Sequence, residues 1–130
     1  KAFILWKDPS NPIHSLQWQL TYLAIDCVHS YTDLQSNEYI QARKMLDVAL
    51  SSDQYWWAST KPWWSLEMIE QGAFRFLDIV KSIPDISENE INAAQRYYQK
   101  IVSTAFEWQR TGKVRQMARE QNEAKRIPFK

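Results

Sequence analysis

Apolar residues recur at intervals of three and four along most of the chain, and this spacing limits what the chain can fold into. The most regular run comprises Ile91, Ala94, Tyr98, Ile101, Ala105 and Trp108. Such a narrow stripe is typical of a helix that packs along its whole length. The chain holds only two glycines and five prolines, and the prolines fall where helices should begin or end. The sequence therefore predicts an all-α fold of long helices joined by short turns.

Four main helices are expected. The first covers roughly residues 13–32, and Ser36 is placed to cap the second. The buried stripe of this second helix is predicted to be Ile40, Leu46, Ala49 and Leu50. Ser59 or Thr60 before Pro62 predicts the start of the third helix.

Gly72 interrupts the third helix and indicates the close approach of a neighbouring helix. Ser87 and Glu90 form a capping box that opens the fourth helix, and Gly112 is expected to end it. The predicted fold is an up-down four-helix bundle with an additional short C-terminal helix or tail.

A chain of 130 residues amounts to about one domain. We expect an extended lead-in at 1–12, a helical bundle domain at 13–112, and a basic helical or disordered tail at 113–130. Residues 1–109 hold nine Lys and Arg against thirteen Asp and Glu, whereas residues 110–130 hold seven against two. Glu120 and Glu123 interrupt the basic run and no aromatic residue interleaves it, so a nucleic-acid partner is disfavoured.

No apolar run approaches the roughly 20 residues that cross a bilayer, and no export leader is visible, so we expect a cytoplasmic protein without a membrane partner. Lys1 is followed closely by the apolar run 3–6, which suggests a fragment of a longer protein. Cys27 lies on a predicted apolar face and is expected in the core. His14 and His29 lack metal-ligand spacing and are expected at the surface or as caps, so neither a metal nor a cofactor is predicted.

The segment 51–64 concentrates aromatic surface, because four of the seven tryptophans fall within residues 56–64. Adjacent helical residues point about 100° apart, so the rings of residues 55–57 cannot all share one buried stripe. Either these rings form interhelical core, or an exposed indole covers the apolar face of a sugar while nearby polar groups bond its hydroxyls. The candidate ligand-binding residues are Asp53, Tyr55, Trp56, Trp57, Trp63 and Trp64.

The stretch from Ala49 to Trp57, Ala-Leu-Ser-Ser-Asp-Gln-Tyr-Trp-Trp, resembles the Ser-Asp-aromatic stretch in the helical domain of family 57 glycoside hydrolases. The resemblance covers residues 42–64. It implies a helical region that packs on a β/α barrel of the same protein. By the same resemblance, Trp57, Trp63 or Trp64 would line an α-glucan cleft.

The second Trp-Trp pair does not match that family, and nothing in the chain reads as a β/α barrel with its catalytic carboxylates. We therefore expect no catalytic residue here, since resemblance does not transfer an activity whose residues are absent. The leading hypothesis is a helical accessory domain whose aromatic cluster lines a sugar cleft or contacts the barrel. The alternative is a helical protein–protein interaction or dimerisation module, with a second copy as one partner.

Overall fold

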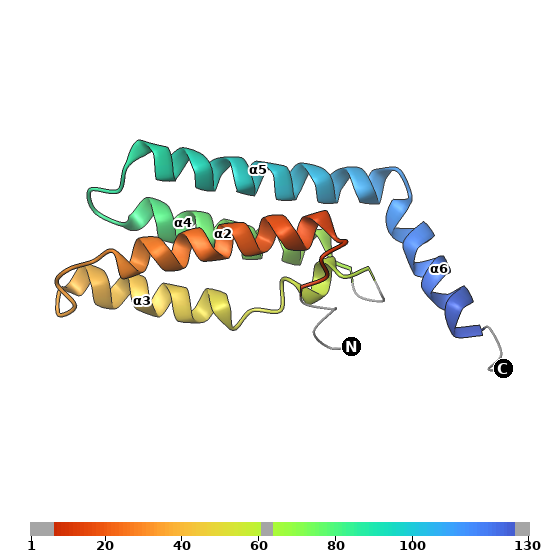
Figure 1. The fold of residues 1–130 in the computed structure, drawn as a ribbon, viewed down its shortest axis with the longest axis horizontal. Helices are drawn as coiled ribbons and strands as arrows, with labels where there is room; N and C mark the ends of the chain where they lie inside the picture. Colours follow the sequence, from red (N-terminus) through yellow and green to blue (C-terminus); the bar gives the residue numbers. More distant parts are fainter. Residues whose placement is uncertain (1–6, 61–63, 127–130) are drawn as a thin grey trace.

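The computed structural model describes residues 7–60 and 64–126, and all regular structure in that part is helical (Figure 1). The elements are α2 (Pro12–His29), α3 (Asn37–Leu50), the 3-10 turn η1 (Trp56–Ala58), α4 (Leu66–Ser82), α5 (Glu88–Arg110) and α6 (Lys113–Arg126). The predicted all-α class is confirmed. None of the described helices has the length and apolar character that a membrane span requires.

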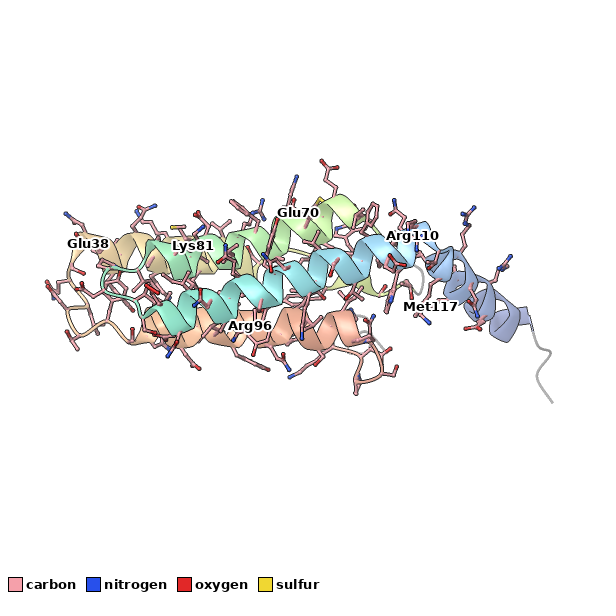
Figure 2. All side chains as sticks on the ribbon, turned by 90° about the horizontal axis from the view of Figure 1, so that it is seen from above. Glu38, Glu70, Lys81, Arg96, Arg110 and Met117 are labelled. Atoms are coloured by element: carbon pink, nitrogen blue, oxygen red, sulfur yellow. The ribbon has the colours of Figure 1, made fainter. Side chains whose placement is uncertain are left out.

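Helices α2 to α5 lie side by side, and consecutive helices run in opposite directions (Figure 1). The pair α4 and α5 packs most extensively, α2 contacts both, and α3 lies against α2 and α4 at one side. Helix α6 turns away after α5 and extends beyond the end of the other helices (Figures 1 and 2). The loop between α3 and α4 lies at this same end.

Side-chain caps fix the helix starts. The Oγ of Ser36 accepts the Tyr39 N–H at 3.1 Å, and the Oγ of Ser87 accepts the Glu90 N–H at 3.1 Å, so both predicted starts are confirmed. The predicted start of the third helix is wrong. Ser65 caps α4, because the chain first forms η1 and then buries Ser59 and Thr60 instead of turning into a helix. Pro62 lies outside the described residues.

The core is built from one face of each long helix. Its fully buried members include Ile13, Leu20, Cys27, Ile69, Phe76, Ile79, Val80 and Ile101. The Sγ of Cys27 donates to a Glu90 carboxylate oxygen at 3.3 Å, and burial raises the pKa of this thiol to about 12, which confirms the core role. On α3, Leu46 and Ala49 are buried as predicted.

Two predicted core positions on α3 are wrong, because Ile40 and Leu50 are exposed. Helix α3 packs mainly against α2 and α4, so its buried stripe is narrower than that of α5. At the other end of the chain, Gly112 adopts a φ of 82° and ends α5 as predicted. Helix α6 follows, with Val114 and Met117 packed on the core.

Candidate functional site

A row of polar side chains on α2 anchors the loop between α3 and α4. We call residues 51–60 together with Trp64 and Ser65 the aromatic loop. The row consists of four buried residues spaced by three and four: Asn11, His14, Gln17 and Thr21. The first three bond the backbone carbonyls of Ala58, Tyr55 and Gln54, in that order, over 2.9, 2.8 and 3.1 Å. These bonds satisfy loop backbone groups that would otherwise be buried without partners.

His14 is the central anchor. The Asp8 N–H donates to its Nδ1 at 2.9 Å, which leaves Nε2 as the protonated nitrogen that donates to the Tyr55 carbonyl. Burial lowers the pKa of His14, against smaller raising effects of the Tyr55 carbonyl and the Asp8 charge. The expectation that His14 lies at the surface is therefore wrong, whereas His29 is exposed as expected.

Tyr55 forms the apolar part of the anchor. Its ring stacks on Trp18 with centroids 4.4 Å apart and planes 11° apart, and its hydroxyl lies 2.5 Å from the Thr21 Oγ1. Only 3% of Tyr55 is exposed, and burial raises the pKa of its hydroxyl to about 12. Tyr55 therefore holds the loop and leaves no open ring face for a ligand.

Gln54 packs the aromatic loop onto α4 at Gly72. A Cβ at position 72 would lie 2.4 Å from the Gln54 Cβ, which is closer than carbon atoms approach. The Gln54 Nε2 donates to the Ser52 Oγ at 3.1 Å. The expectation that Gly72 admits a neighbouring helix is thus corrected, because the close approach comes from a loop side chain.

Two of the candidate tryptophans are brought to the same end of the molecule. The Ser65 N–H donates to the Trp57 carbonyl at 2.9 Å, which closes the segment between them. Trp64 stacks on Trp108 with centroids 6.2 Å apart and donates from Nε1 to the Gln109 Oε1 at 2.9 Å. Both indoles are half-buried against the core. Each ring thus combines a packed part with an open part.

The remaining candidates differ in what the structure describes. Asp53 is exposed and its carbonyl accepts the Trp57 N–H at 3.2 Å. Trp56 lies in η1, but its side chain is outside the described part of the chain, and Trp63 lies outside the described residues altogether. Among the candidates whose side chains the structure describes, Asp53 is exposed and Trp57 and Trp64 are half-buried.

Backbone strain occurs within the aromatic loop. Thr60 adopts a φ of 60° although it is β-branched and buried, a combination that is rare outside glycine. Its Oγ1 donates to the Ser59 carbonyl at 2.6 Å. Such strain is maintained only where the surroundings enforce it, and it concentrates at functional sites.

The chemistry that this site offers is binding. Among the side chains that the structure describes in residues 7–60 and 64–120, no group of three or more His, Cys, Asp or Glu is placed to hold a metal ion. The aromatic loop combines one exposed carboxylate, the serine hydroxyls at 51 and 52, and two partly open indoles. Flat apolar rings beside short polar groups suit a ligand with both apolar and hydroxyl faces.

Asn11, Gln17 and Thr21 were not among the site residues predicted from the sequence. A signal for them exists, since these polar residues recur at helical spacing beside the apolar stripe of α2. That spacing indicates a buried polar face, but it does not say what the face binds. The partners are backbone carbonyls far along the chain, and their positions become visible only in the fold.

Together, the fold and the site define an all-α domain that holds an aromatic loop at one end. No protein-family model, curated protein or solved structure matches the chain. The resemblance to family 57 glycoside hydrolases therefore stays a prediction from residues 42–64.

Proposed function

We propose that the chain is a helical accessory domain of a carbohydrate-active protein of the family 57 type. Its helices α2 to α5 form an up-down four-helix bundle, and its aromatic loop contacts an α-glucan or the β/α-barrel domain of the same protein. The observation that carries the proposal is the triple anchor of Asn11, His14 and Gln17 on the loop carbonyls.

An anchored loop is favourable for binding because its ordering entropy is lost on folding, before any ligand arrives. Buried polar side chains contribute less to a core than apolar ones of the same size, so three of them devoted to one loop support a role for its shape. The strained backbone at Thr60 in the same loop also supports a role for the shape of this loop.

The exposed chemistry fits a glucan. The indoles of Trp57 and Trp64 are both half-buried and packed against the core, so each keeps part of its surface exposed to solvent. The Asp53 carboxylate accepts hydrogen bonds and so suits sugar hydroxyls. The same surface also suits a domain contact, in which tryptophans are enriched.

Amide NMR spectra recorded with maltoheptaose, and separately with a family 57 β/α-barrel domain, test this proposal. One of the two should shift the resonances of residues 51–58, and Trp57→Ala should abolish the shift. Val48→Ala serves as the matched control, because Val48 is an exposed residue on α3 outside the loop. If neither maltoheptaose nor the barrel domain shifts the loop resonances, the proposal is wrong.

A further inference from the structure

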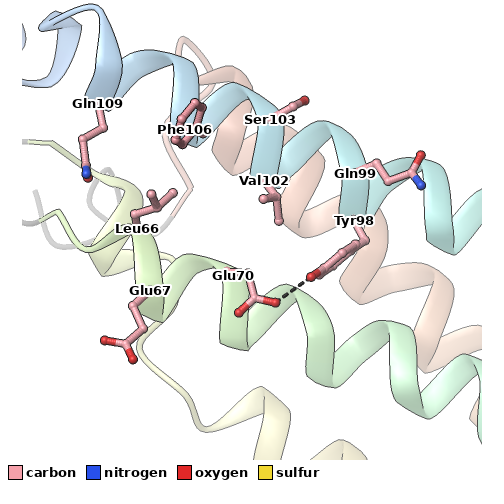
Figure 3. A pocket seen from close by; sticks show the side chains of 9 residues that line it. All are labelled: Leu66, Glu67, Glu70, Tyr98, Gln99, Val102, Ser103, Phe106 and Gln109. Carbon is pink, nitrogen blue, oxygen red and sulfur yellow. Dashed lines mark hydrogen bonds between the residues drawn. The ribbon is translucent and has the colours of Figure 1, made fainter.

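A second surface lies between the first half of α4 and the second half of α5. It does not involve the hydrogen bonds by which α2 side chains anchor the carbonyls of the aromatic loop. It is a groove of about 880 Å³ (Figure 3). Its principal lining residues are Leu66, Glu67 and Glu70 on α4 and Tyr98, Val102 and Phe106 on α5. The groove is open to solvent, so any molecule that fills it must come from outside the described fold.

The two walls of the groove follow helical spacing. On α5, Tyr98, Val102 and Phe106 follow one another at intervals of four residues, and on α4 the same interval separates Leu66 from Glu70. Rows at this spacing form ridges with a channel between them, which is the geometry that accepts a third helix. From Tyr98 to Phe106 the wall is about 12 Å long at 1.5 Å per residue, so it accommodates roughly two turns of a partner helix.

The exposed ring of Phe106 lines this channel, and a second exposed ring, Phe74, packs beside the lining residue Tyr98. Phe74 is 50% exposed and Phe106 is 54% exposed, although each sits next to buried core on its own helix. Phe74 packs edge-on against Tyr98 with centroids 6.2 Å apart. Exposed aromatic side chains that rim an apolar groove mark surfaces for another molecule.

The groove is preformed. The Tyr98 hydroxyl donates to a Glu70 carboxylate oxygen at 2.5 Å and thereby ties α5 to α4 between two of the lining side chains (Figure 3). This bond fixes both side chains, so a partner does not have to order them on binding.

The charge of the groove selects its occupant. Both charged residues that line it, Glu67 and Glu70, are acidic, and no Lys or Arg is among the lining residues. The neighbouring Glu107 already pairs with Arg110. A partner that brings lysine or arginine beside its apolar residues is therefore electrostatically favoured.

A second copy of the chain fits this groove poorly. Symmetric pairing of the face with itself brings the glutamates of both copies together, and like charges at an interface are unfavourable. The basic helix α6 is also unsuited, because its Val114 and Met117 already pack on the core of their own chain.

We propose that the groove between α4 and α5 binds a basic amphipathic helix of another protein or domain. Its apolar residues, at positions i, i+4 and i+7, fill the space between Leu66 and Val102, and its lysines or arginines face Glu67 and Glu70. This proposal does not rest on the function proposed for the aromatic loop, although the two sites adjoin, since the lining residue Gln109 accepts the Trp64 Nε1–H.

Calorimetric titration with synthetic helical peptides of about three turns tests the proposal. The probe has leucine at i, i+3, i+4 and i+7 with lysine elsewhere, and its two controls are a scrambled peptide and a leucine–glutamate counterpart. We expect the lysine peptide to bind, and the glutamate and scrambled peptides to bind at least about tenfold more weakly.

Single substitutions locate the site. Phe106→Ala and Glu67→Lys should each weaken binding of the lysine peptide by at least about fivefold, because one removes a rim anchor and the other reverses a charge. Both residues are exposed, so neither change disturbs the core. The matched control Val48→Ala alters an exposed residue on α3 and should leave the affinity unchanged.

Four results would overturn the proposal. Equal binding of the scrambled peptide would show nonspecific adsorption that does not depend on apolar spacing. Equal binding of the glutamate peptide would show that the groove does not select for charge. Equal affinity of Phe106→Ala and the unaltered chain would place the peptide elsewhere. Sedimentation showing a dimer that Phe106→Ala dissociates would assign the groove to a second copy of the chain.

Discussion

The Nε2 of His14 donates to the carbonyl of Tyr55 at 2.8 Å, and this single bond joins positions 41 residues apart. The two bonds together require a neutral imidazole, because Nδ1 accepts from the Asp8 N–H while Nε2 donates to the loop. Protonation of Nδ1 would bring two donors together and break the contact with Asp8, whereas Nε2 could still donate to Tyr55. The fold around this anchor is thus coupled to the protonation of one buried side chain.

Stability should fall on mild acidification. Burial lowers the pKa of His14 in the folded state, so between its unfolded value near 6.5 and the lower folded value the unfolded chain binds more protons. The contribution of His14 to the free energy of unfolding should therefore be constant above about pH 7 and decrease as the pH falls below about 6.5. Urea unfolding at pH 7.5, 6.5 and 5.5 measures the change.

His14→Gln and His29→Gln provide the comparison for this pH dependence. His29 is exposed, so its replacement should leave the pH slope between 5.5 and 6.5 intact. His14→Gln should flatten that slope while lowering stability at pH 7.5. An unchanged slope in His14→Gln would contradict the role assigned to His14.

Gly72→Ala should destabilise the fold even though alanine favours helices by about 1 kcal/mol over glycine. The added Cβ would lie 2.4 Å from the Gln54 Cβ, so the loop or α4 must shift, at a cost of about 1–3 kcal/mol. Urea unfolding gives the difference. Gln54→Gly removes the opposing Cβ, so in the double variant Gly72→Ala should cost much less stability than it does alone. If the free-energy changes of the two substitutions simply add, the clash is not the cause of the loss.

Thr60→Gly should be more stable than Thr60→Ala by about 1 kcal/mol, because only glycine adopts a positive φ without strain. Both variants lack the hydroxyl that bonds the Ser59 carbonyl, so the comparison isolates the backbone. Thermal unfolding of the pair measures it. Equal stability would mean that the backbone at position 60 carries no strain.

Tyr55→Phe should cost about 1 kcal/mol through loss of the hydroxyl contact with Thr21, whereas Tyr55→Ala should cost about 3–5 kcal/mol through loss of the buried ring. Amide hydrogen exchange then reports on the loop. The amides of Trp57 and Ser65, which bond loop carbonyls, should exchange faster in Tyr55→Ala than those at the centre of α5. Uniform acceleration across the chain would indicate global unfolding instead.

The helical class could be predicted from the sequence because spacing and caps act locally. Ser36 and Ser87 bond amides three residues away, and the stripe of α5 is set by its own periodicity. The prediction that Ser59 or Thr60 starts a helix is wrong. Their preference for a cap is weaker than the tertiary burial that follows η1, and burial depends on residues far along the chain.

The candidate site was predictable only in part for the same physical reason. Aromatic density identified the segment, and Tyr55 and Trp57 do differ in burial as expected. The helix geometry behind that expectation is wrong, because residues 55–58 form a turn and η1 after α3 has ended. The anchors on α2 were not predictable, because His14 binds a backbone carbonyl and a carbonyl leaves no mark on the sequence. The groove depends on how α4 and α5 pair, which single-helix patterns do not specify.

The anchors of the aromatic loop span 34 to 47 positions along the chain. Contacts of such separation require the intervening α3 to fold back, so we expect the loop to acquire its shape late in folding. A peptide comprising residues 51–65 alone should therefore not reproduce the surface. The arrangement of Asp53, Trp57 and Trp64 therefore depends on the docking of α2. It should be present only in completely folded molecules and absent from any partly folded species in which α2 has detached.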